Sequence, residues 1–141
     1  MKIETVEQQV RYAETDRMQV VHHANYLLWF EIGRTQLLAS AGYAYHELEA
    51  SGTRFPVIEY GCRLIGSADY GDRVRIDTYI SQLRSRTVEF AYEVFNGDKR
   101  IATGMTKHIA ADLNQKPRRM DAALLDALRV YVAVSTEPQN R

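Results

Sequence analysis

The feature of the sequence that most constrains its fold is one long helical pattern that is apolar on nearly every side where it begins. Residues 25–41 repeat apolar side chains at three- and four-residue spacing, and residues 26–30 (YLLWF) form an unbroken bulky apolar run. Asn25 is a possible N-cap, and Gly42 can end the helix. A helix without a polar face needs cover from other elements, so we expect this helix to be buried.

Segments of alternating hydrophobicity follow this helix and can supply that cover. Apolar and polar residues alternate along them, which is typical of strands with one buried face. Asn96-Gly97 is a favoured two-residue hairpin turn, and short connections between consecutive strands favour antiparallel pairing. The predicted strands occupy residues 58–64, 74–80, 88–94 and 99–111, and a further strand precedes the helix at residues 3–12.

Two shorter helices complete the predicted order. One covers residues 44–50, and the other covers residues 121–132 with Leu124, Leu125 and Leu128 directed inward. The sequence has no internal repeat and no linker, and 141 residues is the size of one ordinary domain. We therefore expect a single α+β domain over residues 1–141, with a curved antiparallel sheet wrapped around a long central helix.

Charge and cysteine content exclude several classes of function. Lys and Arg total 18 and so do Asp and Glu, and a formal net charge of zero argues against nucleic-acid binding. Cys62 is the only cysteine, so no intrachain disulfide can form, and a lone thiol fits a reducing compartment. No signal-peptide core is apparent, and no apolar run reaches the about 20 residues of a membrane span. We expect a cytoplasmic protein without a membrane span.

The residues at the start of the long helix carry the functional signal. A Tyr-x-x-x-Asp pattern is followed by a histidine seven residues later, then by Ala-Asn-Tyr, and then by Phe-Glu and an arginine within the helix. This pattern resembles the opening motif of the 4-hydroxybenzoyl-CoA thioesterase-like group of acyl-CoA thioesterases, and weaker similarity covers nearly the whole chain. The resemblance implies the hotdog fold and hydrolysis of an acyl-CoA. The motif residues are Tyr12, Asp16, His23, Ala24, Asn25, Tyr26, Phe30, Glu31 and Arg34.

Thioester hydrolysis needs a carboxylate that attacks the carbonyl or activates water, and donors for the developing oxyanion. The resemblance assigns the carboxylate to Asp16, either as a nucleophile that forms a mixed anhydride or as a general base. It places the backbone N–H of His23 against the thioester oxygen, at the positive end of the helix dipole. The His23 imidazole can carry a proton or merely cap the helix. Tyr12 can donate a hydrogen bond in the site or fill the core as a strand residue.

Neighbouring residues receive weaker assignments. Asn25 and Glu31 are predicted to contribute to substrate binding, and Arg34 is a candidate partner for Glu31 within the helix. We expect Glu14 to be a solvated neighbour of the catalytic carboxylate, and we expect His22 to be structural and to point away from the next histidine. No metal site is predicted, because two adjacent histidines cannot easily share one metal and no further ligands have zinc-site spacing.

Coenzyme A, here part of the substrate and not a cofactor, brings phosphates that need cations. Arg84, Arg86 and Thr87 form a basic turn between two predicted strands, and the planar fork of arginine suits phosphate. In the resembled family this region contacts the nucleotide, although an ordinary polar turn explains it equally. One departure is Gln19, where relatives often carry glycine. Glycine permits φ values that glutamine tolerates poorly, so we expect the loop to differ.

Assembly and substrate follow less directly. An open sheet edge favours pairing between subunits, and the resembled family forms dimers with active sites at the subunit boundary, often paired into tetramers. We expect a homo-oligomer that is at least a dimer, and we favour a tetramer formed from two dimers. Alternative functions are a hotdog hydratase or dehydratase and a non-catalytic acyl-CoA binding module. The sequence leaves the acyl group open, because Tyr26, Trp29 and Phe55 can line a pocket or fill the core. An acyl-carrier-protein thioester is a second possible substrate, although the turn with Arg84 and Arg86 favours CoA.

Overall fold

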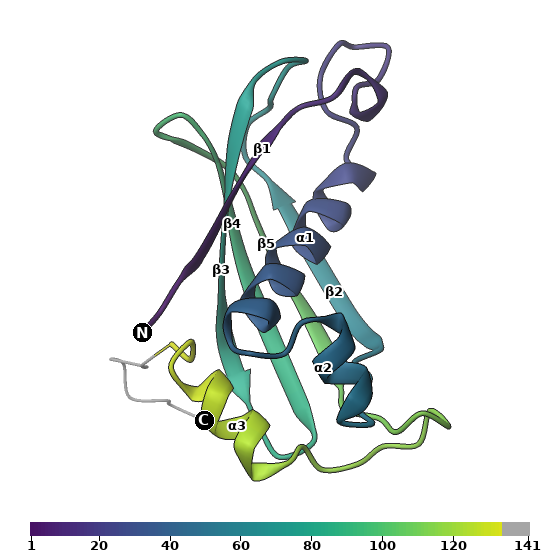
Figure 1. The fold of residues 1–141 in the computed structure, drawn as a ribbon. Coiled ribbons are helices and arrows are strands. Elements are labelled where there is room, and N and C mark those ends of the chain that lie inside the picture. Colours follow the sequence, from purple (N-terminus) through teal and green to yellow (C-terminus); the bar gives the residue numbers. More distant parts are fainter. Residues whose placement is uncertain (134–141) are drawn as a thin grey trace, which may run out of the picture.

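A five-stranded antiparallel sheet forms one layer of the structure, and the long helix α1 crosses one of its faces (Figure 1). The computed structural model describes residues 1–133. The strand order is β1-β3-β4-β5-β2, which confirms the predicted α+β architecture with an antiparallel sheet. The elements are β1 (Glu4–Gln9), a 3₁₀ turn η1 (Tyr12–Glu14), α1 (Ala24–Ser40), α2 (Tyr45–Ala50), β2 (Val57–Leu64), β3 (Arg73–Leu83), β4 (Thr87–Asn96), β5 (Lys99–Ile109) and α3 (Ala122–Arg129).

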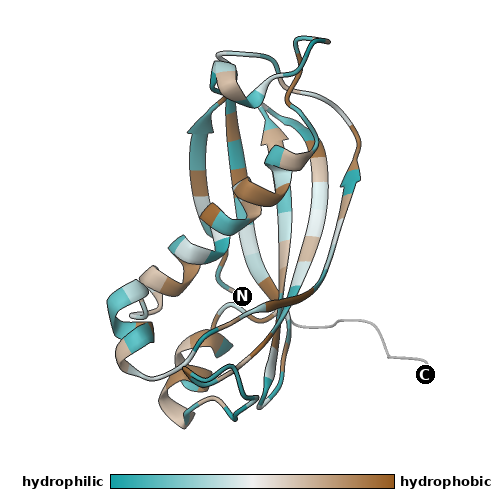
Figure 2. Cartoon of the chain, turned by 90° about the vertical axis from the view of Figure 1, so that its right-hand side faces the viewer, coloured by the Kyte–Doolittle hydropathy of each residue, from teal (hydrophilic) through white to brown (hydrophobic). Residues whose placement is uncertain are grey.

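The alternating pattern of the central strands determines which face of the sheet is buried. Every second residue of β3 as far as Ile80, and of β4 as far as Val94, is buried, and the residues between them are partly or fully exposed. Figure 2 shows the resulting bands of hydrophobic and hydrophilic residues along the strands. The buried set comprises Val74, Ile76, Thr78, Ile80, Val88, Phe90, Tyr92 and Val94.

Two glycines allow α1 to approach this face closely. The Phe30 ring stacks on Tyr92 with ring centroids 4.4 Å apart, and it lies directly over Gly104 of β5. A Cβ at Gly104 would be 2.3 Å from the Phe30 ring, and a Cβ at Gly33 would be 2.2 Å from Thr78 Oγ1. The helix is therefore seated on the sheet at positions that accept no larger residue without a shift of its neighbours.

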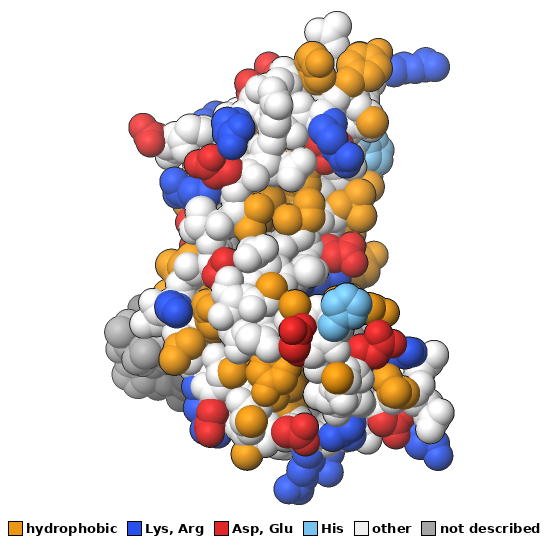
Figure 3. Space-filling view, viewed as in Figure 1, with side chains coloured by type: hydrophobic (Ala, Val, Ile, Leu, Met, Phe, Trp, Pro, Cys, Tyr) orange, Lys and Arg blue, Asp and Glu red, His pale blue; other side chains and the backbone are white. Residues whose placement is uncertain are grey.

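The expectation that α1 is covered on all sides is wrong for this chain. Leu28 and Ile32 are 52% and 37% exposed, although Trp29 and Phe30 beside them are fully buried. The edge strand β2 is also exposed along most of its length. Figure 3 shows hydrophobic side chains at the surface of this side of the molecule. The sheet lies against one side of α1 only, so the other side of the helix and the β2 edge remain uncovered.

Several predicted boundaries differ from the structure. β1 ends at Gln9, so Tyr12 belongs to η1 and not to a strand. The N-cap of α1 is His23 and not Asn25. Gly42 has a φ of 94° just after the helix, which confirms it as the stop signal. The last helix ends at Arg129, three residues before its predicted end. Among residues 1–133, no helix has the length and apolar character to cross a membrane.

A buried polar chain joins the sheet to the segment that precedes β2. His108 Nδ1 lies 2.9 Å from the carbonyl oxygen of Phe55, and a carbonyl only accepts, so Nδ1 carries the hydrogen. Nε2 is then the acceptor and receives the Thr106 hydroxyl at 2.8 Å. The Thr106 oxygen accepts in turn from Tyr92 OH at 2.6 Å. These three hydrogen bonds can be donated in only one order, from Tyr92 to Thr106 to His108 to Phe55. This order requires a neutral His108.

This requirement predicts that stability depends on His108 between neutral and mildly acidic pH. Burial lowers the pKa of His108 to about 4, and the charge of Arg34 acts in the same direction, against the bond to Phe55. The unfolded chain binds this proton near pH 6.5 and the folded chain only near 4. The contribution of His108 to the free energy of unfolding is therefore fully present above pH 6.5. It is lost as the pH falls toward 4, and the total loss is about 3 kcal/mol.

Urea unfolding at pH 7 and pH 4.5 measures this effect. We expect His108→Gln to reduce the pH dependence of the free energy of unfolding, whereas the exposed His46→Gln should leave it unchanged. An equal pH dependence in wild type and His108→Gln would contradict the assignment.

Candidate active site

A narrow loop carries Asp16 to the end of the sheet where α1 begins. Thr15 and Val21 form an antiparallel bridge, and the Asp16 N–H donates to the Val20 carbonyl at 2.9 Å. The Val21 N–H donates to the carbonyl of Ala68 at 2.9 Å, in the connection between β2 and β3. The loop is thus braced on two sides, and Asp16 is the first residue of the turn at its end, where the Gln19 N–H donates to the Asp16 carbonyl at 3.0 Å.

The loop and the β2–β3 connection enclose an open cavity of about 890 Å³. Two carboxylates, of Asp16 and Asp69, lie on its wall. The rings of Tyr12 and Tyr70, which both line this cavity, contact each other edge to face with centroids 5.9 Å apart. The full lining is Tyr12, Thr15, Asp16, Arg17, Met18, Gln19, Asp69 and Tyr70. Tyr12 is 79% exposed, so the alternative that it fills the core is wrong.

The Asp16 carboxylate is oriented by its own loop. Oδ1 accepts a hydrogen bond from the Met18 N–H at 2.8 Å, an arrangement typical of a turn closed by an aspartate side chain. No other hydrogen bond to this carboxylate occurs within the described residues. Gln19, which follows, has a φ of 66°, the left-handed region that favours glycine. The loop therefore adopts the left-handed conformation although it has glutamine and not glycine.

Within the described residues, the segment between this loop and α1 offers one free backbone donor, the N–H of His23. His22 Nδ1 accepts from the Ala24 N–H at 3.2 Å, so the His22 ring caps the helix. The backbone N–H of His23 has no hydrogen-bond partner in residues 1–133. The rings of His22 and His23 lie 4.1 Å apart and inclined by 30°, so the expectation that they point apart is wrong. No cluster of three or more metal-ligating side chains occurs in the described part of the chain.

The structure separates the other predicted residues from this cavity. Asn25 Nδ2 donates to the backbone carbonyl of Glu14 at 3.0 Å, so its amide supports the loop. The Glu31 side chain is 61% exposed on α1 and lies 4.0 Å from Arg34. The basic turn with Arg84, Arg86 and Thr87 joins β3 to β4 at the opposite end of the sheet. The length of β3 places this basic turn about 30 Å from the end of the sheet where Asp16 lies.

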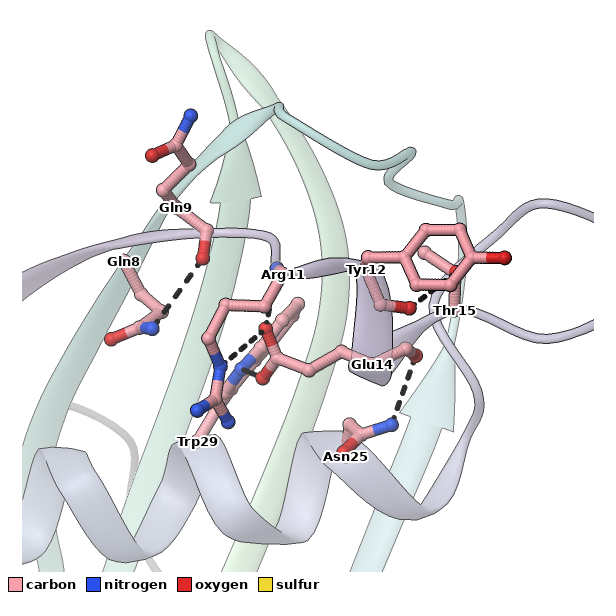
Figure 4. A network of polar contacts seen from close by, with 8 residues as sticks. All are labelled: Gln8, Gln9, Arg11, Tyr12, Glu14, Thr15, Asn25 and Trp29. Atoms are coloured by element: carbon pink, nitrogen blue, oxygen red, sulfur yellow. Dashed lines mark hydrogen bonds and ion pairs between the residues drawn. The ribbon is translucent and has the colours of Figure 1, made fainter.

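Glu14 is the site residue that sequence reasoning missed. It is 2% exposed, so the expectation of a solvated neighbour is wrong. Oε2 accepts the Trp29 indole N–H at 2.8 Å and Oε1 accepts the Arg11 backbone N–H at 2.8 Å (Figure 4). The strand pattern assumed for residues 3–12 does not extend to Glu14, because η1 turns its side chain inward. A buried indole that needs an acceptor was the available signal.

The antiparallel sheet against one long helix is the architecture of the hotdog fold. The chain belongs to the thioesterase-like superfamily, whose family model matches residues 10–128.

Individual relatives cover almost the whole chain. The protein YneP of Bacillus subtilis (strain 168) is 34% identical over 133 residues, which span 93% of this chain and 96% of that protein. A 1,4-dihydroxy-2-naphthoyl-CoA hydrolase of Thermosynechococcus vestitus is 27% identical, over 91% of this chain and 87% of that protein. The crystal structure of a DHNA-CoA thioesterase from Staphylococcus aureus has a TM-score of 0.84 and 31% identity, covering 93% of this chain and 89% of that chain.

Proposed function

We propose that this protein hydrolyses acyl-CoA thioesters in the cavity beside Asp16. The observation that carries the proposal is the placement of the Asp16 carboxylate. It lies on the cavity wall, with one oxygen oriented by the Met18 N–H, and the loop that carries it leads along the chain into α1. The family and the names of the relatives support the same chemistry: an acyl-CoA thioester hydrolase YbgC of Escherichia coli O157:H7 is 25% identical over 118 residues.

The geometry supports two routes for the reaction. In the first, Asp16 attacks the thioester carbonyl, the C–S bond breaks to release the CoA thiolate, and water then hydrolyses the mixed anhydride. In the second, Asp16 takes a proton from water as the water attacks the carbonyl, and the same C–S bond breaks. Both routes place negative charge on the carbonyl oxygen. The N–H of His23 and the positive end of the α1 dipole stabilise that charge.

We propose that two chains pair through their β2 edges. β2 presents unpaired backbone groups and exposed apolar side chains, including Ile58 and Tyr60, and such an edge pairs readily with a second copy. Antiparallel pairing about a two-fold axis places the end of β2 near Leu64 beside the partner's start of β2. The Asp16 end of one chain then adjoins the other end of its partner, where the basic turn lies. The prediction that Arg84, Arg86 and Thr87 bind CoA phosphates requires this pairing.

Size-exclusion chromatography with light scattering measures the molar mass of the assembly and so tests the proposed pairing. We expect the wild-type protein to be at least a dimer at micromolar concentration. Tyr60→Lys should produce monomers, because a lysine on an edge strand opposes pairing. Tyr45→Lys on α2 replaces a similarly exposed tyrosine and should leave the dimer intact. A wild-type monomer at this concentration would disprove the proposed pairing.

The cavity wall favours an acyl group with apolar or aromatic surface. Tyr12, Met18 and Tyr70 are exposed there and offer such a surface next to Asp16. Tyr26 and Trp29, by contrast, pack edge to face in the core, so they are not available to line an acyl pocket. Two of the relatives reported above are named for 1,4-dihydroxy-2-naphthoyl-CoA or DHNA-CoA, which is consistent with an aromatic acyl group.

One assay separates the proposal from its two alternatives. The protein is incubated with an enoyl-CoA while free thiol and the conjugated thioester absorbance are followed together. A thioesterase releases free thiol. A hydratase bleaches the conjugated absorbance without releasing thiol. A binding module changes neither signal, although calorimetry detects the bound ester. Only thiol release that tracks the loss of thioester supports the proposed function.

A further inference from the structure

The buried carboxylate of Glu14 joins the loop that carries Asp16 to α1. The side chain receives the Trp29 indole N–H on Oε2, and the Arg11 backbone N–H on Oε1. The guanidinium Nε of Arg11 adds an ion pair at 3.4 Å. All of these contacts are visible in Figure 4. A carboxylate that is 2% exposed persists only when it is paired in this way, so each contact fixes the position of the group.

The backbone of Glu14 makes a second connection to the same helix. Its carbonyl oxygen accepts from the His22 N–H at 2.8 Å and from Asn25 Nδ2 at 3.0 Å. One residue therefore contacts the segment before η1, the segment that enters α1, and the first two turns of α1 itself. Asp16 lies only two residues further along the chain. The distance between the Asp16 carboxylate and the start of α1 thus depends directly on how Glu14 is held.

We infer that Glu14 is a positioning residue for thioester hydrolysis, whose buried carboxylate fixes Asp16 relative to the free His23 N–H that precedes α1. The inference rests on the proposed function. Glu14 does not line the cavity and touches no reacting atom. Its effect passes through Asp16, so it should change the rate of the chemical step and leave substrate binding largely unaltered.

The amide Glu14→Gln is the sharpest variant. It keeps the shape of the side chain but has one acceptor oxygen where two donors, the Trp29 indole and the Arg11 amide, need one each. We expect kcat to fall about 10²-fold, the cost of a displacement near 1 Å, with KM nearly unchanged. The control is Glu7→Gln, because Glu7 also pairs with an arginine but is exposed, and its loss should not alter kcat.

A double variant separates positioning from general loss of folded protein. If Glu14 acts through Asp16, then Glu14→Gln should not slow the residual reaction of Asp16→Asn any further. If Glu14 had only a structural role, Glu14→Gln would lower kcat by the same factor in the wild-type protein and in Asp16→Asn. That result would overturn the inference. Wild-type kcat in folded Glu14→Gln would overturn it as well. If the amide variant does not fold, Trp29→Phe serves in its place. It removes the indole donor of the hydrogen bond to Glu14 and should also lower kcat at constant KM. Wild-type kcat there refutes the inference.

Failure of the inference and failure of the proposed function give different results. If the wild-type protein does not hydrolyse acyl-CoA, or if Asp16→Asn is as active as wild type, the proposed function fails. If Asp16→Asn is inactive but Glu14→Gln keeps the wild-type kcat, only the inference about Glu14 fails.

Discussion

Asp16→Asn should lower kcat for acyl-CoA hydrolysis about 10³-fold, within the range that positioned acid–base groups contribute. Asparagine has nearly the same shape and retains an oxygen that can accept the Met18 N–H, so the loop should keep its conformation. It can neither take a proton from water at neutral pH nor attack a carbonyl effectively. The loss should therefore appear in kcat, and the affinity for a non-hydrolysable thioether analogue of the substrate should stay close to that of wild type.

The matched control is Asp69→Asn, the second carboxylate on the cavity wall. Asp69 offers a backbone N–H to Asp72 and is not part of the family motif, so its replacement should change kcat far less. Equal losses in the two variants would mean that the negative charge of the cavity, and not Asp16 itself, determines the rate.

Gly104→Ala is expected to destabilise the fold by about 2–3 kcal/mol, at the upper end of the usual cost of overpacking a core. Its Cβ would be 2.3 Å from Phe30 Cε2 and 3.0 Å from the carbonyl oxygen of Gly61. Phe30 cannot move away easily, because it is fully buried and stacked on Tyr92. Relief of the clash therefore requires α1 to move away from the sheet.

Gly61→Ala provides the comparison for this substitution. Gly61 lies in the neighbouring strand, and its Cβ would find no heavy atom closer than 3.9 Å. We expect its free energy of unfolding to stay within about 0.5 kcal/mol of wild type. Urea unfolding at one protein concentration measures both variants. Equal stabilities of the two would show that the contact between Phe30 and Gly104 does not limit the packing.

The strand pattern of the sequence predicted the sheet well, because each central strand buries one face. β3 and β4 show the expected alternation of buried and exposed residues, and Gly42 ends α1 as predicted. The cover of α1 was predicted wrongly. Apolar composition alone does not distinguish residues that are buried within the chain from apolar residues that stay at its surface, and Leu28 and Ile32 belong to the exposed side.

The site was predictable only where a motif identified it. Asp16 and Tyr12 both belong to the motif and both line one cavity, and their catalytic roles stay predictions. Glu14 was misjudged because a short 3₁₀ turn replaces the strand and reverses the direction of its side chain. The resemblance assigned Arg84 to the nucleotide end of CoA, and the antiparallel topology places Arg84 and Asp16 at opposite ends of one chain. Such relations depend on the path of the chain in space, which local periodicity does not describe.

The most direct test of the central claim is the mass balance of the reaction catalysed by the wild-type protein. Short-chain, long-chain and aromatic acyl-CoAs are incubated with it, and free CoA and free acid are quantified together. The account predicts equal amounts of the two products for at least one ester, and the aromatic ester should be among the better substrates. Folded protein that releases no CoA from any member of this panel would contradict it.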